Sequence, residues 1–144
     1  MKLLNSNKKA YFEYFIEDTF EAGIVLVGSE VKSVKNGHIS IGESYISIKN
    51  NELFLKNAYI KPYEKTNNFS VDEKRIRKLL LNKAEIEKIR KKTEVKGYSI
   101  VPTKVYLKDN LVKVEIAIAK GKKLYDKRET IKQRDLSRQI KENY

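Results

Sequence analysis

The chain has 144 residues, enough for a single domain with its own hydrophobic core. It contains no Cys and one His, which excludes disulfides, thiol nucleophiles and zinc sites built from Cys or several His side chains. Its 31 Lys and Arg residues exceed its 19 Asp and Glu residues, which gives a formal net charge of +12. Such an excess attracts polyanions, chiefly nucleic acid or an anionic membrane surface. No apolar segment is long enough to span a membrane and the N-terminus lacks a signal-peptide core, so we expect a cytoplasmic protein.

The N-terminal part of the chain predicts two strands and a short helix. Aromatic and aliphatic side chains alternate with others over residues 10–16, which is typical of a strand. A second strand is expected over residues 23–27, with a turn at Asp18 and Thr19 between the two. Helical spacing of valines then predicts a helix over residues 29–35, ended by Gly37.

Two hairpins and one capped helix are expected further along the chain. Asn50–Asn51 joins the first hairpin, over residues 45–49 and 52–56, because Asn tolerates the positive φ of tight turns. Residues 61–72 predict a long surface loop. The helix begins after Asn82, which forms a capping-box pattern with Glu85, and Gly97 closes the element. The second hairpin comprises residues 98–107 and 111–119, around Asp109 and Asn110.

Six short strands with two or three helices indicate a mainly β fold. The leading candidate is a closed six-stranded antiparallel barrel of the oligonucleotide-binding type, with the helices on its flanks, over residues 1–119. Residues 120–144 form a separate basic tail with nine basic and four acidic side chains. Few of its side chains are apolar, although Ile131, Leu136 and Ile140 lie on one helical stripe. We therefore expect the tail to be disordered when free and helical against a polyanion.

The carboxylates Glu13, Glu17, Asp18 and Glu21 have the chemistry of a Mg²⁺ site, but no positioned base or second ligand cluster accompanies them. A solvated strand face explains them better. His38 has no Ser, Asp or Cys motif beside it. We expect a protein that is not an enzyme and needs no cofactor.

A run of basic residues precedes the capped helix: Lys74, Arg75, Arg77 and Lys78. Two interpretations of this run are open at this point. Either it binds phosphate next to the positive end of the helix, or it is a solvated run of charge.

Three long segments resemble the small protein B (SmpB) family: "EYFIEDTFEAGIVLVGSEVKSVKNG", "RKLLLNKAEI" and "AIAKGKKLYDKRETIKQRD". The resemblance runs from Asn7 through the tail. It implies a barrel that binds the tRNA-like domain of transfer-messenger RNA (tmRNA) and catalyses nothing. It further implies that the tail enters the vacant mRNA channel of a stalled ribosome, near the decoding centre, where it meets small-subunit ribosomal RNA. The expected protein is a monomer when free and has no membrane partner.

The resemblance also implies two sets of functional residues. The tmRNA-binding set is Asn7, Lys8, Lys9, Glu21, Leu80 and Asn82. The ribosome-binding tail set is Gly121, Lys122, Lys123, Tyr125, Asp126, Lys127, Arg128, Ile131, Lys132 and Arg134. Many members of the family carry His at the place of Tyr125, and both rings stack on bases, but Tyr cannot become cationic near neutral pH. The alternative function is that of a generic barrel for single-stranded RNA, which would bind any unpaired RNA alike.

Overall fold

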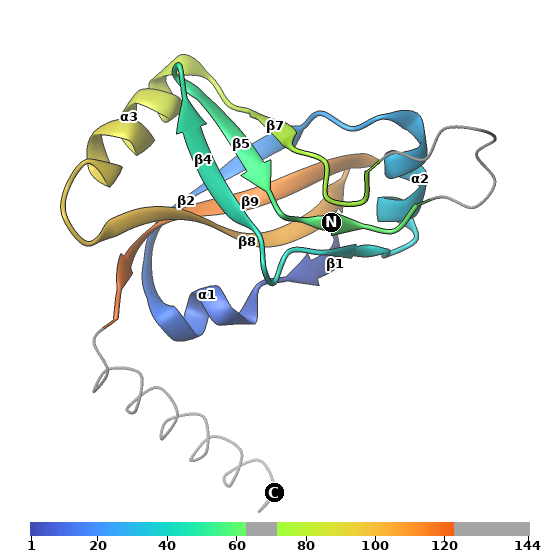
Figure 1. Ribbon diagram of the computed structural model, residues 1–144, viewed down its shortest axis with the longest axis horizontal. Helices are drawn as coiled ribbons and strands as arrows, with labels where there is room; N and C mark the ends of the chain where they lie inside the picture. Colours follow the sequence, from blue (N-terminus) through green and yellow to red (C-terminus); the bar gives the residue numbers. More distant parts are fainter. Residues whose placement is uncertain (63–71, 123–144) are drawn as a thin grey trace, which may run out of the picture.

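The computed structural model describes residues 1–62 and 72–122 (Figure 1). The expected loop over residues 61–72 and the expected tail helix fall largely outside the described residues. The nine described strands are β1 Lys2–Ser6, β2 Tyr14–Ile24, β3 Ile39–Ser40, β4 Tyr45–Lys49, β5 Glu52–Lys56, β6 Tyr59–Ile60, β7 Arg77–Leu80, β8 Tyr98–Lys108 and β9 Leu111–Gly121. The three described helices are α1 Lys8–Glu13, α2 Gly28–Lys35 and α3 Lys83–Thr93.

Seven of these strands form one antiparallel sheet in the order β1-β8-β9-β2-β7-β5-β4, and β3 pairs with β6 alone. The long strands β2, β8 and β9 cross the middle of the molecule, and the three helices lie around them (Figure 1). The mainly β class is confirmed. The closed six-stranded barrel is not what the structure shows, because β1 and β4 remain as the two edges of a seven-stranded sheet.

The hydrophobic core lies within the curve of this sheet. Most of its buried members come from the strands, chiefly β5, β8 and β9, and α2 and α3 each add one residue, Val34 and Ile89. Val114, Ile116 and Ile118 alternate with other residues along β9 and have no exposed surface. Ala117 and Ala119 on the opposite side of β9 are also fully buried. The second half of β9 is therefore covered on both faces, whereas alternation suggested a half-buried strand.

The predictions for the two hairpin turns and for the helix ends are confirmed. Asn50 and Asn51 have φ values of 53° and 58°, and Asp109 and Asn110 have 51° and 64°. Gly37 ends α2 with a φ of 82°. Asn82 and Glu85 form both hydrogen bonds of the capping box at the start of α3. These features depend on short-range chemistry, which explains why the sequence specified them.

The N-terminal prediction is wrong. Residues 8–13 form α1, capped by Asn7, and the strand begins only at Tyr14. Asp18 and Thr19 are not a turn, because β2 runs unbroken to Ile24 and only its register with β9 shifts between Ile16 and Thr19. Such a shift is a β-bulge, in which extra residues are accommodated without ending the strand. Of the strand predicted over residues 23–27, only Gly23 and Ile24 are strand, at the end of β2, and residues 25–27 lie outside it.

The basic run before α3 is mostly structural. Arg77 is fully buried, and its Nε donates to Glu30 Oε2 at 2.8 Å while its Nη1 donates to the Ala58 carbonyl at 2.6 Å. Arg75 Nη2 donates to Glu30 Oε1 at 2.6 Å. Arg77 therefore cannot grip phosphate, and the network instead joins α2 to the start of β7. Lys78 pairs with Glu52 of β5 at 3.1 Å.

Candidate nucleic-acid interface

The structure divides the expected tmRNA-binding residues into two groups. The first comprises the expected residues Glu21, Leu80 and Asn82. Together with Gly23, which was not among the expected residues but lies opposite Leu80, they are called here the β2–β7 surface. The second, called here the α1 surface, consists of Asn7, Lys8 and Lys9. In Figure 1, α1 lies below β8 while β7 and the start of α3 lie at the upper side of the molecule. An RNA that contacts both groups has to extend across the sheet.

Backbone pairing builds the β2–β7 surface. Gly23 of β2 lies opposite Leu80 of β7, and Leu80 keeps half of its surface exposed. A Cβ at position 23 would come within 3.3 Å of Leu80 Cβ, so the glycine gives Leu80 room to lie across the neighbouring strand. A cavity of about 380 Å³ lies at this surface and is lined mainly by apolar side chains around Gly23 and Leu80. Lys35 and Lys113 also line this cavity, which combines an apolar wall with cations. A second cavity, of about 280 Å³, lies at α1.

Glu21 is held from two sides. The Tyr106 hydroxyl donates to Glu21 Oε2 at 2.8 Å, and Lys108 Nζ donates to the same oxygen at 3.3 Å. The hydrogen bond from Tyr106 is the main cause that lowers the pKa of Glu21, so this carboxylate is ionised at neutral pH. Burial, followed by the hydrogen bond to Glu21, raises the pKa of Tyr106, which therefore keeps its proton. Glu21 presents its other oxygen, Oε1, as a hydrogen-bond acceptor.

Asn82 uses only part of its hydrogen-bonding capacity. Its Oδ1 accepts from the Glu85 N–H at 2.8 Å and caps α3. Its amide nitrogen has no acceptor among the described residues, and the side chain is exposed. Asn82 thus joins a structural role to a free donor, two residues after Leu80.

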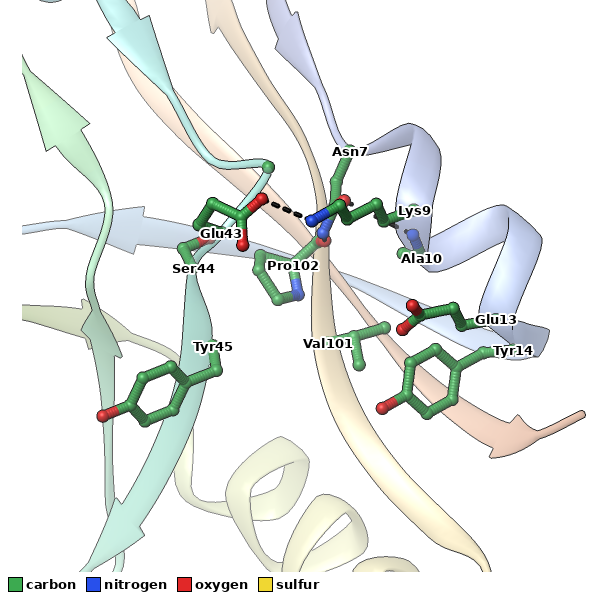
Figure 2. A pocket seen from close by; sticks show the side chains of 11 residues that line it. Asn7, Lys9, Ala10, Glu13, Tyr14, Glu43, Ser44, Tyr45, Val101 and Pro102 are labelled. Carbon is green, nitrogen blue, oxygen red and sulfur yellow. Dashed lines mark hydrogen bonds and ion pairs between the residues drawn. The ribbon is translucent and has the colours of Figure 1, made fainter.

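The α1 surface borders the smaller cavity, between α1, β8 and the start of β4 (Figure 2). Asn7 is 5% exposed, and its Nδ2 donates to the Pro102 carbonyl at 2.9 Å while its Oδ1 accepts from the Ala10 N–H at 3.3 Å. Both polar groups of Asn7 therefore serve the fold. To contact RNA, Asn7 would have to share these groups with the fold. The sequence did not indicate that they are already bonded.

The two lysines of the α1 surface differ. Lys9 forms an ion pair with Glu43, in the loop before β4, and points across the cavity toward it (Figure 2). The hydrogen bond that Lys9 donates to Glu43 raises the pKa of Lys9, and the same contact lowers the pKa of Glu43. Lys8 is exposed and has no ion-pair partner among the described residues. Lys8 is thus immediately available to phosphate, whereas Lys9 must exchange Glu43 for it.

Of the expected tail residues, the structure describes Gly121 and Lys122. The tail was expected to begin after Ala119, but β9 continues to Gly121, which lies opposite Tyr14 of β2. Lys122 contacts α1. The remaining residues of that set, from Lys123 to Arg134, lie outside the described part of the chain.

The carboxylates of β2 do not form a metal site within the described ranges, where no group of three His, Cys, Asp or Glu side chains is arranged to hold an ion. Asp18 pairs with Lys88 of α3 at 3.7 Å, and Glu17 accepts a hydrogen bond from the Tyr98 hydroxyl at 3.2 Å. No helix among the described residues has the length and apolar character needed to cross a membrane.

Sequence reasoning missed Tyr106 and Lys108 as the residues that hold Glu21. Tyr106 lies in the expected strand over residues 98–107, where no sequence feature singled it out. The contact joins positions 85 residues apart and spans β9, so no short-range pattern could have indicated it.

Comparison with known proteins identifies the family. The model of the family described as "SmpB protein" matches residues 4–144. An SsrA-binding protein of Thermoanaerobacter pseudethanolicus is 52% identical over 144 residues, covering 100% of this chain and 92% of the relative. An SsrA-binding protein of Geobacter metallireducens is 50% identical over 139 residues, covering 96% and 91%. A chain of a solved structure described as "tmRNA-SmpB: a journey to the center of the bacterial ribosome" has a TM-score of 0.68 and 42% identity, covering 83% of this chain and 84% of that one. The chain belongs to the SmpB protein family.

Proposed function

We propose that this protein binds the tRNA-like domain of tmRNA and delivers it to stalled ribosomes for trans-translation, without catalysing a reaction. The observation that carries the proposal is the similarity to SsrA-binding proteins over the entire chain, at about half of all positions. Its net charge of +12 favours an RNA partner. The curved, mainly antiparallel sheet supplies a rigid surface on which side chains can meet folded RNA, as in oligonucleotide-binding folds.

The β2–β7 surface is the proposed main RNA contact. Glu21 offers an ionised acceptor for base edges or 2′-hydroxyls, and Asn82 offers an amide donor. Between them, Leu80 provides an exposed apolar side chain on which a base or ribose can pack. Folded RNA is recognised by such combinations of shape, hydroxyl contacts and stacking. Lys8 and Lys9 of the α1 surface would neutralise phosphates of the same RNA.

The tail is proposed to act on the ribosome. Residues 123–144 would occupy the vacant mRNA channel, with Lys123, Lys127 and Arg128 on ribosomal phosphates and Tyr125 on a base. Lys132 and Arg134 would add further phosphate contacts, and Ile131 would belong to the apolar stripe of the induced helix. In this account the protein works in the cytoplasm as a monomer until it meets its RNA.

A competition gel shift tests the RNA-binding part. The full chain is bound to labelled tRNA-like domain and challenged with an excess of unlabelled tRNA-like domain or of unstructured RNA of equal length. We expect only the tRNA-like domain to displace the label at low concentration. Equal displacement by both RNAs would favour a general single-strand binder and overturn the specific proposal.

A further inference from the structure

Lys122 follows β9 directly and is held by two contacts with α1 and one with Phe15 of β2. Its backbone N–H donates to the Glu13 carbonyl at 2.9 Å. Its Nζ donates to the Tyr11 carbonyl at 3.2 Å and lies 5.0 Å from the centroid of the Phe15 ring. Both carbonyls belong to the last turn of α1, where backbone oxygens lack partners within the helix. The residue at the base of the tail is therefore attached to the helix on which Lys8 and Lys9 lie.

Phe15 has no evident role in the core. It is 47% exposed although it is large and apolar, and it is the second residue of β2, opposite Lys120. A cation above an aromatic face is attracted by the ring, and at exposed sites such a contact favours one side-chain position over others. The exposed ring thus serves as a platform for the ammonium of Lys122.

Gly121, the residue before Lys122, is held on the side away from α1. The Gly121 N–H donates to the Gly97 carbonyl at 3.1 Å, which ties the end of β9 to the turn after α3. Gly121 lies in regular strand pairing with Tyr14, and a Cβ there would meet no atom within 4 Å. Gly121 therefore needs no special conformation in this structure, and the direction of the chain is set at Lys122.

We propose that Lys122 and Phe15 are positioning residues, which fix the direction in which the tail leaves the sheet relative to α1. This inference rests on the proposed function of the tail, and it gives Lys122 a task different from that of the other tail lysines. Its charge is used by α1 and Phe15, whereas the later cations bind ribosomal phosphates. Because α1 also carries the α1 surface, the bound tRNA-like domain and the tail acquire a defined mutual orientation before the ribosome is reached.

Four variants distinguish the proposed positioning role of Lys122 and Phe15 from a general effect of positive charge. Lys122→Ala removes the ammonium, and Phe15→Leu removes the ring while leaving every charge in place. Lys122→Arg keeps a cation that can stack and donate. Lys120→Ala is the matched control, because Lys120 is an exposed lysine two residues earlier, within β9, and its side chain forms no ion pair with a described residue.

The first measurement needs neither tmRNA nor ribosome. The chain has no Cys, so Ser40→Cys and Leu124→Cys give a unique pair of spin labels, one on β3 and one just beyond Lys122. We expect a narrow distance distribution in the parent, in Lys122→Arg and in Lys120→Ala. Lys122→Ala and Phe15→Leu should broaden it. An unchanged distribution in both of these variants would overturn the proposal.

The second measurement is peptide tagging in a reconstituted translation system, beside a gel shift on the tRNA-like domain. Lys122→Ala and Phe15→Leu should lower the tagging rate about two- to fivefold, with RNA binding within about twofold of the parent. Normal tagging by Phe15→Leu, or a tagging defect without broadening in Lys122→Ala, would contradict the positioning role. If the parent itself fails to bind tmRNA, the proposed function fails, and the spin-label distances still decide whether Lys122 fixes the chain direction.

Discussion

The Tyr106 hydroxyl donates a hydrogen bond to Glu21 Oε2 at 2.8 Å, although β8 and β2, which carry the two residues, lie on either side of β9. The contact ties three central strands together on their outer face. It also fixes which oxygen of Glu21 is occupied. The surface proposed to read RNA is therefore organised before RNA arrives, which lowers the entropy lost on binding.

Tyr106→Phe tests this organisation. The ring remains, so the sheet should keep its stability, but Glu21 loses its neutral donor. We expect affinity for the tRNA-like domain to fall about three- to tenfold, the range for one hydrogen bond. Glu21→Ala should abolish most of the effect of Tyr106→Phe when the two are combined, because both act through the same carboxylate. Independent, multiplying losses in gel-shift affinity would show that Tyr106 does not act through Glu21.

Substitutions at Asn82 should distinguish its role as a helix cap from its proposed role in RNA binding. Asn82→Ala removes the cap of α3, which costs about 1 kcal/mol of stability, and also removes the amide donor. Asn82→Asp keeps a capping oxygen but replaces the donor with a negative charge. We expect Asn82→Asp to unfold in urea like the parent and to bind the tRNA-like domain more weakly. If it binds as well as the parent, Asn82 is a helix cap only.

Glu43→Gln should strengthen RNA binding. Glu43 pairs with Lys9 at the α1 surface, where both side chains are exposed. Removing the carboxylate frees the Lys9 ammonium for phosphate, so affinity should rise about twofold or more. The gain should disappear in a Lys9→Ala background. A gain that persists there would assign the effect to net charge alone.

The Glu30 network predicts a dependence of stability on pH. Burial by itself raises the pKa of Glu30, but the hydrogen bonds from Arg75, the Val27 N–H and Arg77 outweigh it, and the pKa lies below its ordinary value. A lowered pKa gives stability that is present above about pH 4.5, the ordinary value, and is lost as the pH falls through the folded-state value.

Glu30→Gln tests that network through urea unfolding at pH 7 and pH 3. Replacing one member of a buried ion pair leaves Arg77 without its counter-charge, so the variant should lose about 3 kcal/mol at pH 7. Between pH 5 and pH 3 it should lose less stability than the parent does, because the titrating group is gone. Equal slopes for the two proteins would mean that other carboxylates control acid unfolding.

The sequence indicated those features that depend on neighbouring residues. Asn50–Asn51 and the Asn82 capping box are local, and both were predicted at the right positions. The strand predicted over residues 10–16 was wrong because Asn7 caps a helix, KKAYFE, ahead of Tyr14. Only packing against β8 decides whether this segment is helix or strand. Long-range pairs were invisible. Arg77 belonged to a basic run for which phosphate binding and solvation were both open, and its partner Glu30 lies 47 residues away.

Only part of the candidate site could be predicted, again because long-range contacts leave no local pattern in the sequence. Resemblance to a family pointed to Glu21, Leu80 and Asn82, and strand pairing brings Leu80 beside Gly23 of β2. It did not indicate that Asn7 is buried with both polar groups bonded, nor that Tyr106 holds Glu21. Those facts depend on the relative placement of β8 and β9, which no local pattern encodes.

Peptide tagging on stalled ribosomes is the most direct test of the proposed function. The full chain is compared with a chain that ends at Lys122, which retains all of β9 and the contact of Lys122 with α1. The proposed function predicts that both chains bind the tRNA-like domain in a gel shift and that only the full chain supports tagging. Gln133→Pro in the full chain should also block tagging, since Pro costs about 3 kcal/mol inside a helix without changing a charge. Normal tagging by the chain ending at Lys122, or no tagging by the full chain with tmRNA and stalled ribosomes present, would contradict the account.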